Sequence, residues 1–153
     1  MDVKHFFKAR LDWFAKPKGT TRYVKNHSVT MEGKDPLRLS AAKAFKGDPT
    51  AYNPEDLLLS SVVSCHMMSY LFVCHQHGIE VISYQDEAQA VLEVGANYAG
   101  RITEVQLFPK VTIRQKDKIA LALSLHTQAN ALCFIANSCN FPIVHSAICD
   151  YEE

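Results

Sequence analysis

The sequence has no excess of charge of either sign and no long run of like charges. Its 16 lysine and arginine residues balance 16 aspartate and glutamate residues, so the formal net charge is zero. Proteins that bind nucleic acid need a basic face to attract phosphates. We therefore do not expect nucleic acid as a partner.

The sequence also lacks export and membrane signals. It opens with Met1-Asp2-Val3-Lys4 and does not continue with the charged, apolar and small segments of a secretory signal. Its apolar stretches are interrupted before the roughly 18 residues that a membrane span requires. We expect a cytoplasmic protein without a membrane partner.

The sequence also lacks the even number of cysteines that a framework of structural disulfides needs. An odd number of cysteines and the absence of a signal peptide favour thiols that stay reduced and form only transient disulfides. The five are Cys65, Cys74, Cys133, Cys139 and Cys149.

The composition predicts one domain over residues 1–153, because a hydrophobic content of 48% can fill a core and neither repeats nor linkers interrupt the chain. Alternating apolar and polar residues predict a strand over 3–13 with one buried face. Turn residues at 16–19 and 32–34 place N-terminal strands within 3–40, followed by a loop over 42–53.

A helix is expected over 54–77. Asn53 is a candidate N-cap, Pro54 suits the first helical position, and two acidic residues follow in the first turn. Gly78 is the expected stop. This helix is apolar nearly all round, so it must be covered on every side.

The remaining residues predict a hairpin over 79–114, a second apolar helix over 116–137 and a C-terminal strand over 143–151. This order is typical of an α+β fold in which antiparallel sheets wrap two buried helices. Helices this apolar indicate that a second subunit helps to bury them, which predicts a homodimer.

The cysteines and histidines on these helices can also be explained as ordinary core or surface residues. Free cysteines often fill cores as small hydrophobes. His66 points to a different side of its helix from Cys65, so a core or interface role is expected. The segment Cys74-His75-Gln76-His77 lacks a second Cys/His pair, and we expect no metal there.

Two motifs together resemble the OsmC/Ohr family of organic hydroperoxide reductases. One is Asn53-Pro54-Glu55-Asp56-Leu57-Leu58, with Cys65 ten residues after the glutamate; the other is Cys133-Phe134-Ile135-Ala136-Asn137-Ser138. The resemblance spans roughly residues 20 to 150 in element order. It implies an intertwined homodimer with two antiparallel sheets around central helices.

The resemblance also implies the chemistry. Cys65 would attack an organic hydroperoxide, Cys133 would form the transient disulfide, and an external dithiol of lipoyl type would reduce it, with no cofactor and no metal. Glu55 would hold the arginine that activates the thiolate. Arg22 is our choice for that arginine, because its distance ahead of Glu55 resembles that of the arginine in the Ohr branch.

Several alternatives stay open. Arg38 and Lys43 are other candidates for the cation, and Cys139 is another candidate for the second redox thiol. Ten residues of helix separate Glu55 from Cys65 by ~15 Å, so a shared site requires Glu55 of the partner subunit. A small-molecule-binding or redox-sensing protein without peroxidase turnover is the alternative function.

Overall fold

The computed structural model describes residues 2–16, 19 and 23–153. The chain divides into two compact units at Leu57 and Leu58, and each unit is described by itself. The long helix α1 (Pro54–Gln76) begins at the end of the first unit and continues through the second.

The first unit holds an antiparallel sheet of three strands in the order β1 (Arg10–Asp12), β2 (His27–Thr30) and β3 (Leu37–Leu39). β2 and β3 are joined by a turn in which Lys34 donates its N–H to Met31 O at 3.1 Å. Gly33 has φ +74° in this turn, a conformation that favours glycine. A short 3₁₀ turn (Lys43–Phe45) interrupts the expected loop over 42–53.

The predicted strand over 3–13 is wrong in length and in burial. Only Arg10–Asp12 is a strand, and Leu11 and Phe7 are 62% and 94% exposed. Alternation produces a buried face only where another layer packs against it, and within the described chain these side chains have no such layer.

Helix α1 begins and ends where the sequence predicts. The Asn53 side chain accepts the N–H of Asp56 at 2.9 Å, and the Asp56 carboxylate accepts the N–H of Asn53 at 3.1 Å. This reciprocal pair satisfies two donors of the first turn. At the other end Gly78 has φ +63°, and Ile79 N–H bonds to Cys74 O at 2.9 Å.

By length and composition alone, α1 is long and apolar enough to cross a membrane. The expectation that no stretch reaches that length is therefore wrong for this helix. A core helix of a globular protein meets the same criterion, and α1 places Val62, Tyr70 and Val73 in the core with no exposure.

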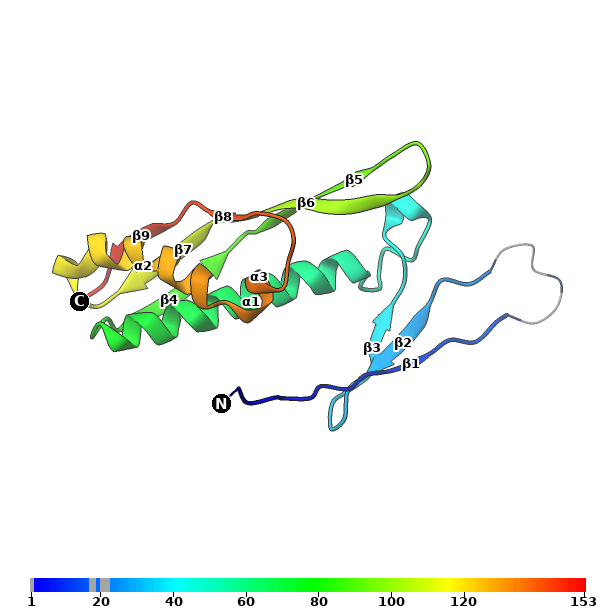
Figure 1. Cartoon of the computed structure of the whole chain (residues 1–153), viewed down its shortest axis with the longest axis horizontal. Helices are drawn as coiled ribbons and strands as arrows, with labels where there is room; N and C mark the ends of the chain where they lie inside the picture. Colours follow the sequence, from blue (N-terminus) through cyan, green and yellow to red (C-terminus); the bar gives the residue numbers. More distant parts are fainter. Residues whose placement is uncertain (1, 17–18, 20–22) are drawn as a thin grey trace. The chain divides into compact units, whose positions relative to one another are not determined.

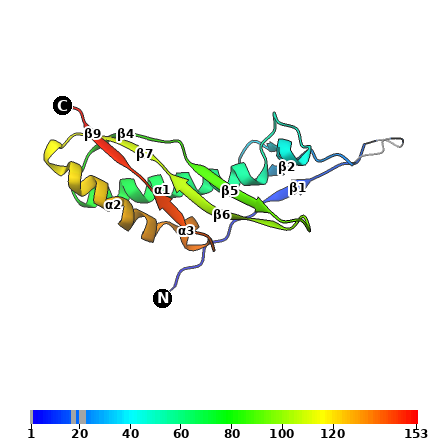
Figure 2. The same cartoon turned by 90° about the horizontal axis from the view of Figure 1, so that it is seen from above.

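The strands of the second unit form two three-stranded sheets (Figures 1 and 2). β4 (Val81–Asp86), β7 (Pro109–Ile113) and β9 (Ile148–Tyr151) make one, in the order β4-β7-β9. β5 (Gln89–Val94), β6 (Gly100–Leu107) and β8 (Ile143–His145) make the other, in the order β5-β6-β8. The predicted hairpin over 79–114 is thus two antiparallel pairs.

Asp86 marks the break between these two pairs. Its Oδ1 accepts the N–H of Phe108 at 2.8 Å, between β6 and β7. Burial raises the pKa of Asp86, while this bond opposes the rise.

The C-terminal segment corrects two predictions. The strand over 143–151 is two strands in different sheets, and both pair in parallel, β8 with β6 and β9 with β7. The sheets are therefore mixed, and the expectation of purely antiparallel sheets is wrong at these edges. Parallel pairing needs a long crossover, which α2 (Ile119–Leu132) provides here.

Helices α1 and α2 pack side by side against the sheets (Figure 2). One core cluster joins both helices to β7, and Tyr70 OH donates to Ala122 O at 3.0 Å within it. A second cluster centres on Val62, Val105 and Leu107. The positions of Cys65 and Cys133 follow from this helix pairing.

Candidate active site

Cys133 sits at a break in the predicted helix over 116–137. It separates α2 from α3 (Phe134–Asn137) with φ −72° and ψ 110°, an extended conformation. Its Sγ accepts the N–H of Ala136 at 3.4 Å and so caps α3. The continuous helix that the sequence predicts is wrong here, because apolar content alone does not reveal where a side chain replaces the backbone acceptor.

Cys65 and Cys133 lie together although they are far apart along the chain. Burial, followed by the side chain of the neighbouring Cys65, raises the pKa of Cys133 to about 11. Cys133 is fully buried, whereas Cys65, near the middle of α1, is half-buried. A reagent from solvent therefore meets Cys65 first, with a protonated thiol directly behind it.

The surface beside this thiol pair is apolar. Met68 and Phe72 follow Cys65 on the same face of α1, three and seven residues on, and are 57% and 55% exposed. Phe134, next to Cys133, is 82% exposed. Exposed apolar side chains gathered at one place are typical of a binding surface for an apolar group or another protein.

The other cysteines take core positions. Cys139 packs against the cluster around Val62, and burial raises its pKa. Cys74 is fully buried in the other cluster, beside Tyr70, and Cys149 packs against that cluster, with burial again the main cause of their raised pKa values. The structure brings neither Cys74 nor Cys149 to the pair formed by Cys65 and Cys133.

The Cys74-His75-Gln76-His77 segment does not converge on a point, since Cys74 is buried while both histidines are exposed. Across residues 2–16, 19 and 23–153, no three histidine, cysteine, aspartate or glutamate side chains are arranged as metal ligands. His66 is a core histidine, 1% exposed.

Glu55 lies in the first turn of α1 and lines a hollow of about 340 Å³ in the first unit, with Lys25 and His27 on its wall. Neither residue is predicted from the sequence, because neither belongs to a recognisable motif. Either side chain supplies a positive or titratable group near Glu55. Lys25 also donates to the backbone oxygen of Phe45.

The cation candidates differ in what the structure shows. Arg22 lies outside the described residues. Arg38 is held elsewhere, since it donates to Asp48 Oδ2 at 3.0 Å and to Thr50 O at 3.0 Å. Hydrogen bonds from Thr50, with smaller contributions from Asn26 and Arg38, lower the pKa of Asp48 to about 2. Lys43 opens the 3₁₀ turn.

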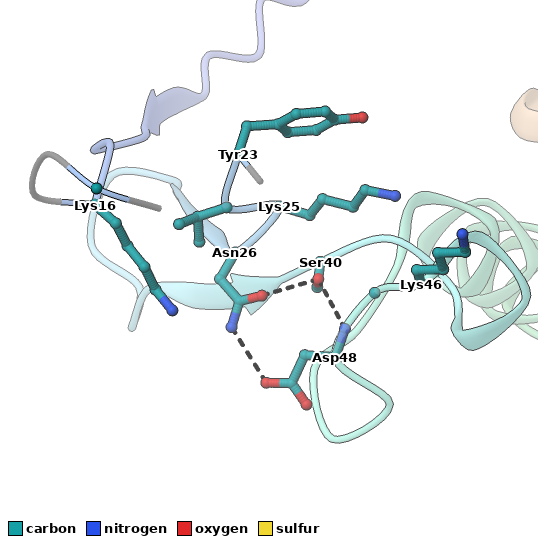
Figure 3. A pocket seen from close by; sticks show the side chains of 10 residues that line it. Lys16, Tyr23, Lys25, Asn26, Ser40, Lys46 and Asp48 are labelled. Atoms are coloured by element: carbon teal, nitrogen blue, oxygen red, sulfur yellow. Dashed lines mark hydrogen bonds between the residues drawn. The ribbon is translucent and has the colours of Figure 1, made fainter. Parts of the chain in front are cut away.

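A larger hollow of about 700 Å³ in the first unit carries three lysines, Lys16, Lys25 and Lys46 (Figure 3). Its floor is held by Asn26, which donates to Asp48 at 3.2 Å and accepts from Ser40 at 3.0 Å. Sequence reasoning did not identify it, because its lysines come from three separate segments. Neither Cys65 nor Cys133 lines it, so it is separate from the thiol pair.

The OsmC-like protein family model matches residues 47–146, which is most of the chain and includes both paired thiols. The chain belongs to the OsmC-like protein family. The resemblance drawn from the helix start and the two cysteines is thereby confirmed. No curated protein matches the chain.

Solved structures with the same fold support this membership. An OsmC-like protein of unknown function from Vibrio cholerae O1 biovar eltor has a TM-score of 0.86 and 24% identity, over 95% of this chain and 100% of that chain. An organic hydroperoxide resistance protein from Elizabethkingia anophelis has a TM-score of 0.71 and 18% identity, over 99% and 100%. The α+β fold class is confirmed, and at these identities the likeness establishes the fold alone.

Proposed function

We propose that this OsmC-like protein is a thiol peroxidase that reduces organic hydroperoxides to alcohols. One observation carries the proposal: a half-buried thiol, Cys65, neighbours a fully buried one, Cys133, whose pKa is raised to about 11. The first thiol is placed to meet an oxidant. The second is placed to trap the oxidised product.

The chemistry balances as follows. The Cys65 thiolate attacks the O–O bond of ROOH, takes one oxygen to become a sulfenic acid, and releases RO⁻, which gains a proton to give ROH. The Cys133 thiol then displaces water from the sulfenic sulfur, forming the disulfide. An external dithiol, of lipoyl type in our proposal, reduces this disulfide by exchange and is itself oxidised.

The apolar surface favours an organic substrate. Hydrogen peroxide gains nothing from Met68, Phe72 and Phe134, whereas an alkyl or aryl hydroperoxide removes part of its own and their apolar area from water, at roughly 25 cal/mol per Å². We therefore expect the preference for an organic hydroperoxide to appear mainly in KM.

A homodimer completes the site in this proposal. Glu55 and Cys65 are ten residues apart on one straight helix, too far for a single arginine to join them within a chain. Glu55 of the partner subunit would hold the activating arginine, Arg22, against Cys65. The protein would act in the cytoplasm, where an external dithiol is maintained in its reduced form.

Steady-state turnover tests the proposal. Purified protein is given cumene hydroperoxide or hydrogen peroxide with dihydrolipoamide as reductant, and hydroperoxide loss is followed. We expect many turnovers with cumene hydroperoxide, a larger KM for hydrogen peroxide, and loss of activity in Cys65→Ser. Cys139→Ser is the matched control, because it changes a partly buried cysteine that packs against the cluster around Val62.

A redox sensor is the second candidate. Arg38 is engaged by Asp48 and Thr50, so one possible activating cation is already occupied. Such a sensor would form the disulfide once and turn over slowly. In the same experiment it gives one equivalent of hydroperoxide consumed per chain and little more under dithiol.

A further inference from the structure

Three histidines from three different elements meet inside the second unit. His66 lies on α1, His126 on α2 and His145 at the end of β8. The rings of His66 and His126 have centroids 5.4 Å apart, and the His145 ring lies 6.0 Å and 5.7 Å from them. His66 and His126 are 1% and 0% exposed, while His145 is half-buried and links the group to the surface.

One hydrogen bond joins the two buried rings. His66 Nε2 and His126 Nδ1 are 3.1 Å apart, and their second ring nitrogens are buried without a hydrogen-bond partner. Whichever ring donates, one buried N–H and one buried lone pair remain unsatisfied. Unpaired buried groups of this kind lower the stability of the fold, so packing alone does not explain why two histidines occupy these positions.

The surroundings keep these rings uncharged at neutral pH. Tyr70 of α1 stacks on His126 at 3.9 Å, Tyr84 of β4 approaches it to 6.4 Å, and His145 of β8 faces both rings. Within the described chain none of these recorded neighbours is a carboxylate. Burial, followed by the charge of the neighbouring histidines, lowers the pKa of His126 to about 3; burial and His145 lower that of His66 to about 4.

The histidine contact and the thiol contact join the same two helices. His66 follows Cys65 directly on α1, and His126 lies two turns before Cys133 at the end of α2. A change that separates the rings therefore also separates the thiols. The histidine pair takes no part in the redox chemistry itself, because His66 faces away from Cys65.

We propose that His66, His126 and His145 form an acid-sensitive switch that holds α1 against α2 when uncharged and releases α2, with Cys133, when protonated. Once a second ring is protonated, two positive charges lie about 6 Å apart or closer, and none of the recorded neighbours is a counter-ion. His145, at the surface, is the entry point for the proton. The switch concerns the thiol pair and holds whether or not that pair reduces hydroperoxides.

Accessibility of Cys133 tests the switch without using peroxidase activity. The reduced protein is exposed briefly to dithiodipyridine, which labels thiols in mild acid, and the modified cysteines are mapped by mass spectrometry from about pH 7 to about pH 4. We expect labelling of Cys133 to rise at least about tenfold as the pH falls through this range and to reverse on return to neutral pH. Cys74, fully buried against the sheet, is the internal control and stays protected.

Variants separate the switch from ordinary acid unfolding. His66→Gln combined with His126→Phe keeps a ring against Tyr70 and removes the two buried titrating groups, so that His145 has no charged ring to oppose and Cys133 should stay protected in acid. His66→Gln alone serves if the double variant does not fold. His75→Gln, on the exposed side of α1, should behave as wild type. Three results would overturn the proposal. Cys133 of the wild type could stay protected throughout the pH range, the double variant could be labelled in acid as strongly as the wild type, or Cys74 could be labelled together with Cys133.

Discussion

The Cys133 thiol neighbours the side chain of Cys65, and burial followed by this neighbour raises its pKa to about 11. Cys133 therefore keeps its proton at neutral pH and is a poor nucleophile toward a distant oxidant. Beside a sulfenic acid on Cys65 it is already in place, so proximity compensates for low thiolate content. The order of reaction in our proposal, Cys65 first and Cys133 second, follows from this difference in burial.

Removing the second thiol should stop the cycle after its first step. In Cys133→Ser we expect Cys65 to react with one equivalent of cumene hydroperoxide and to remain a sulfenic acid, because no thiol lies behind it. Trapping with dimedone and intact-mass measurement checks this. Cys139→Ser is the control and should give no trapped adduct, and an adduct of equal yield in that variant would assign the second thiol to Cys139.

The buried histidines should make stability fall in mild acid. The pKa of His66 is lowered from 6.5 to about 4 and that of His126 from 6.5 to about 3, so below pH 6.5 the unfolded chain binds protons that the folded chain excludes. Their contribution is complete above pH 6.5 and is lost as the pH falls toward 4 and then 3, on the order of 3 kcal/mol for His66 alone. Urea denaturation at several pH values measures it.

The control for that prediction is a pair of variants. His66→Gln should flatten the fall in unfolding free energy, whereas His75→Gln should leave the wild-type curve unchanged. An unfolding free energy that is constant between about pH 6.5 and about pH 4 would contradict the buried, uncharged state of the pair.

Shared sites predict complementation between two inactive variants. Cys65→Ser supplies Glu55, and Glu55→Ala supplies Cys65, so a mixed dimer regains one of its two sites. Random mixing by joint refolding should restore about a quarter of wild-type activity, because half of the dimers are mixed and each has one complete site. Mixtures that stay as inactive as the separate variants would place both residues of a working site in one chain.

The exposed apolar face of α1 predicts self-association. Met68 and Phe72 are more than half exposed in the single chain, and charges there would oppose burial against a second copy. Met68→Lys combined with Phe72→Lys should be monomeric by analytical ultracentrifugation at concentrations where the wild type is dimeric. Gln128→Lys, exposed on α2, is the matched control. A monomeric wild type would remove the basis for the shared site.

The sequence predicts local features of this fold well. The start of α1 depends on Asn53 and Asp56, three residues apart, and its end on Gly78, so a short window holds all the necessary information. The α+β class follows from the order of these local patterns.

Features that depend on distant segments are predicted poorly. The parallel pairing of β8 and β9 depends on strands about 40 residues earlier, and the break at Cys133 depends on a thiol that caps α3. The exposed segment before β1 shows the same limit, since alternation does not say whether a covering layer exists.

The candidate site divides in the same way. Cys65 and Cys133 came from the family resemblance, because no periodicity brings two thiols on separate helices together. The cluster of His66, His126 and His145 was missed since its members are scattered and each alone resembles an ordinary core histidine. Only the packing of α1 against α2 shows that they meet.

Peptide mapping after a single turnover tests the central claim most directly. The reduced protein is mixed with one equivalent of cumene hydroperoxide, quenched with an alkylating agent, and digested without reduction. We predict one disulfide per chain, between the peptides that carry Cys65 and Cys133, with Cys74, Cys139 and Cys149 alkylated. If Cys65 and Cys133 are both recovered as alkylated, unoxidised cysteines, the proposed reaction is contradicted.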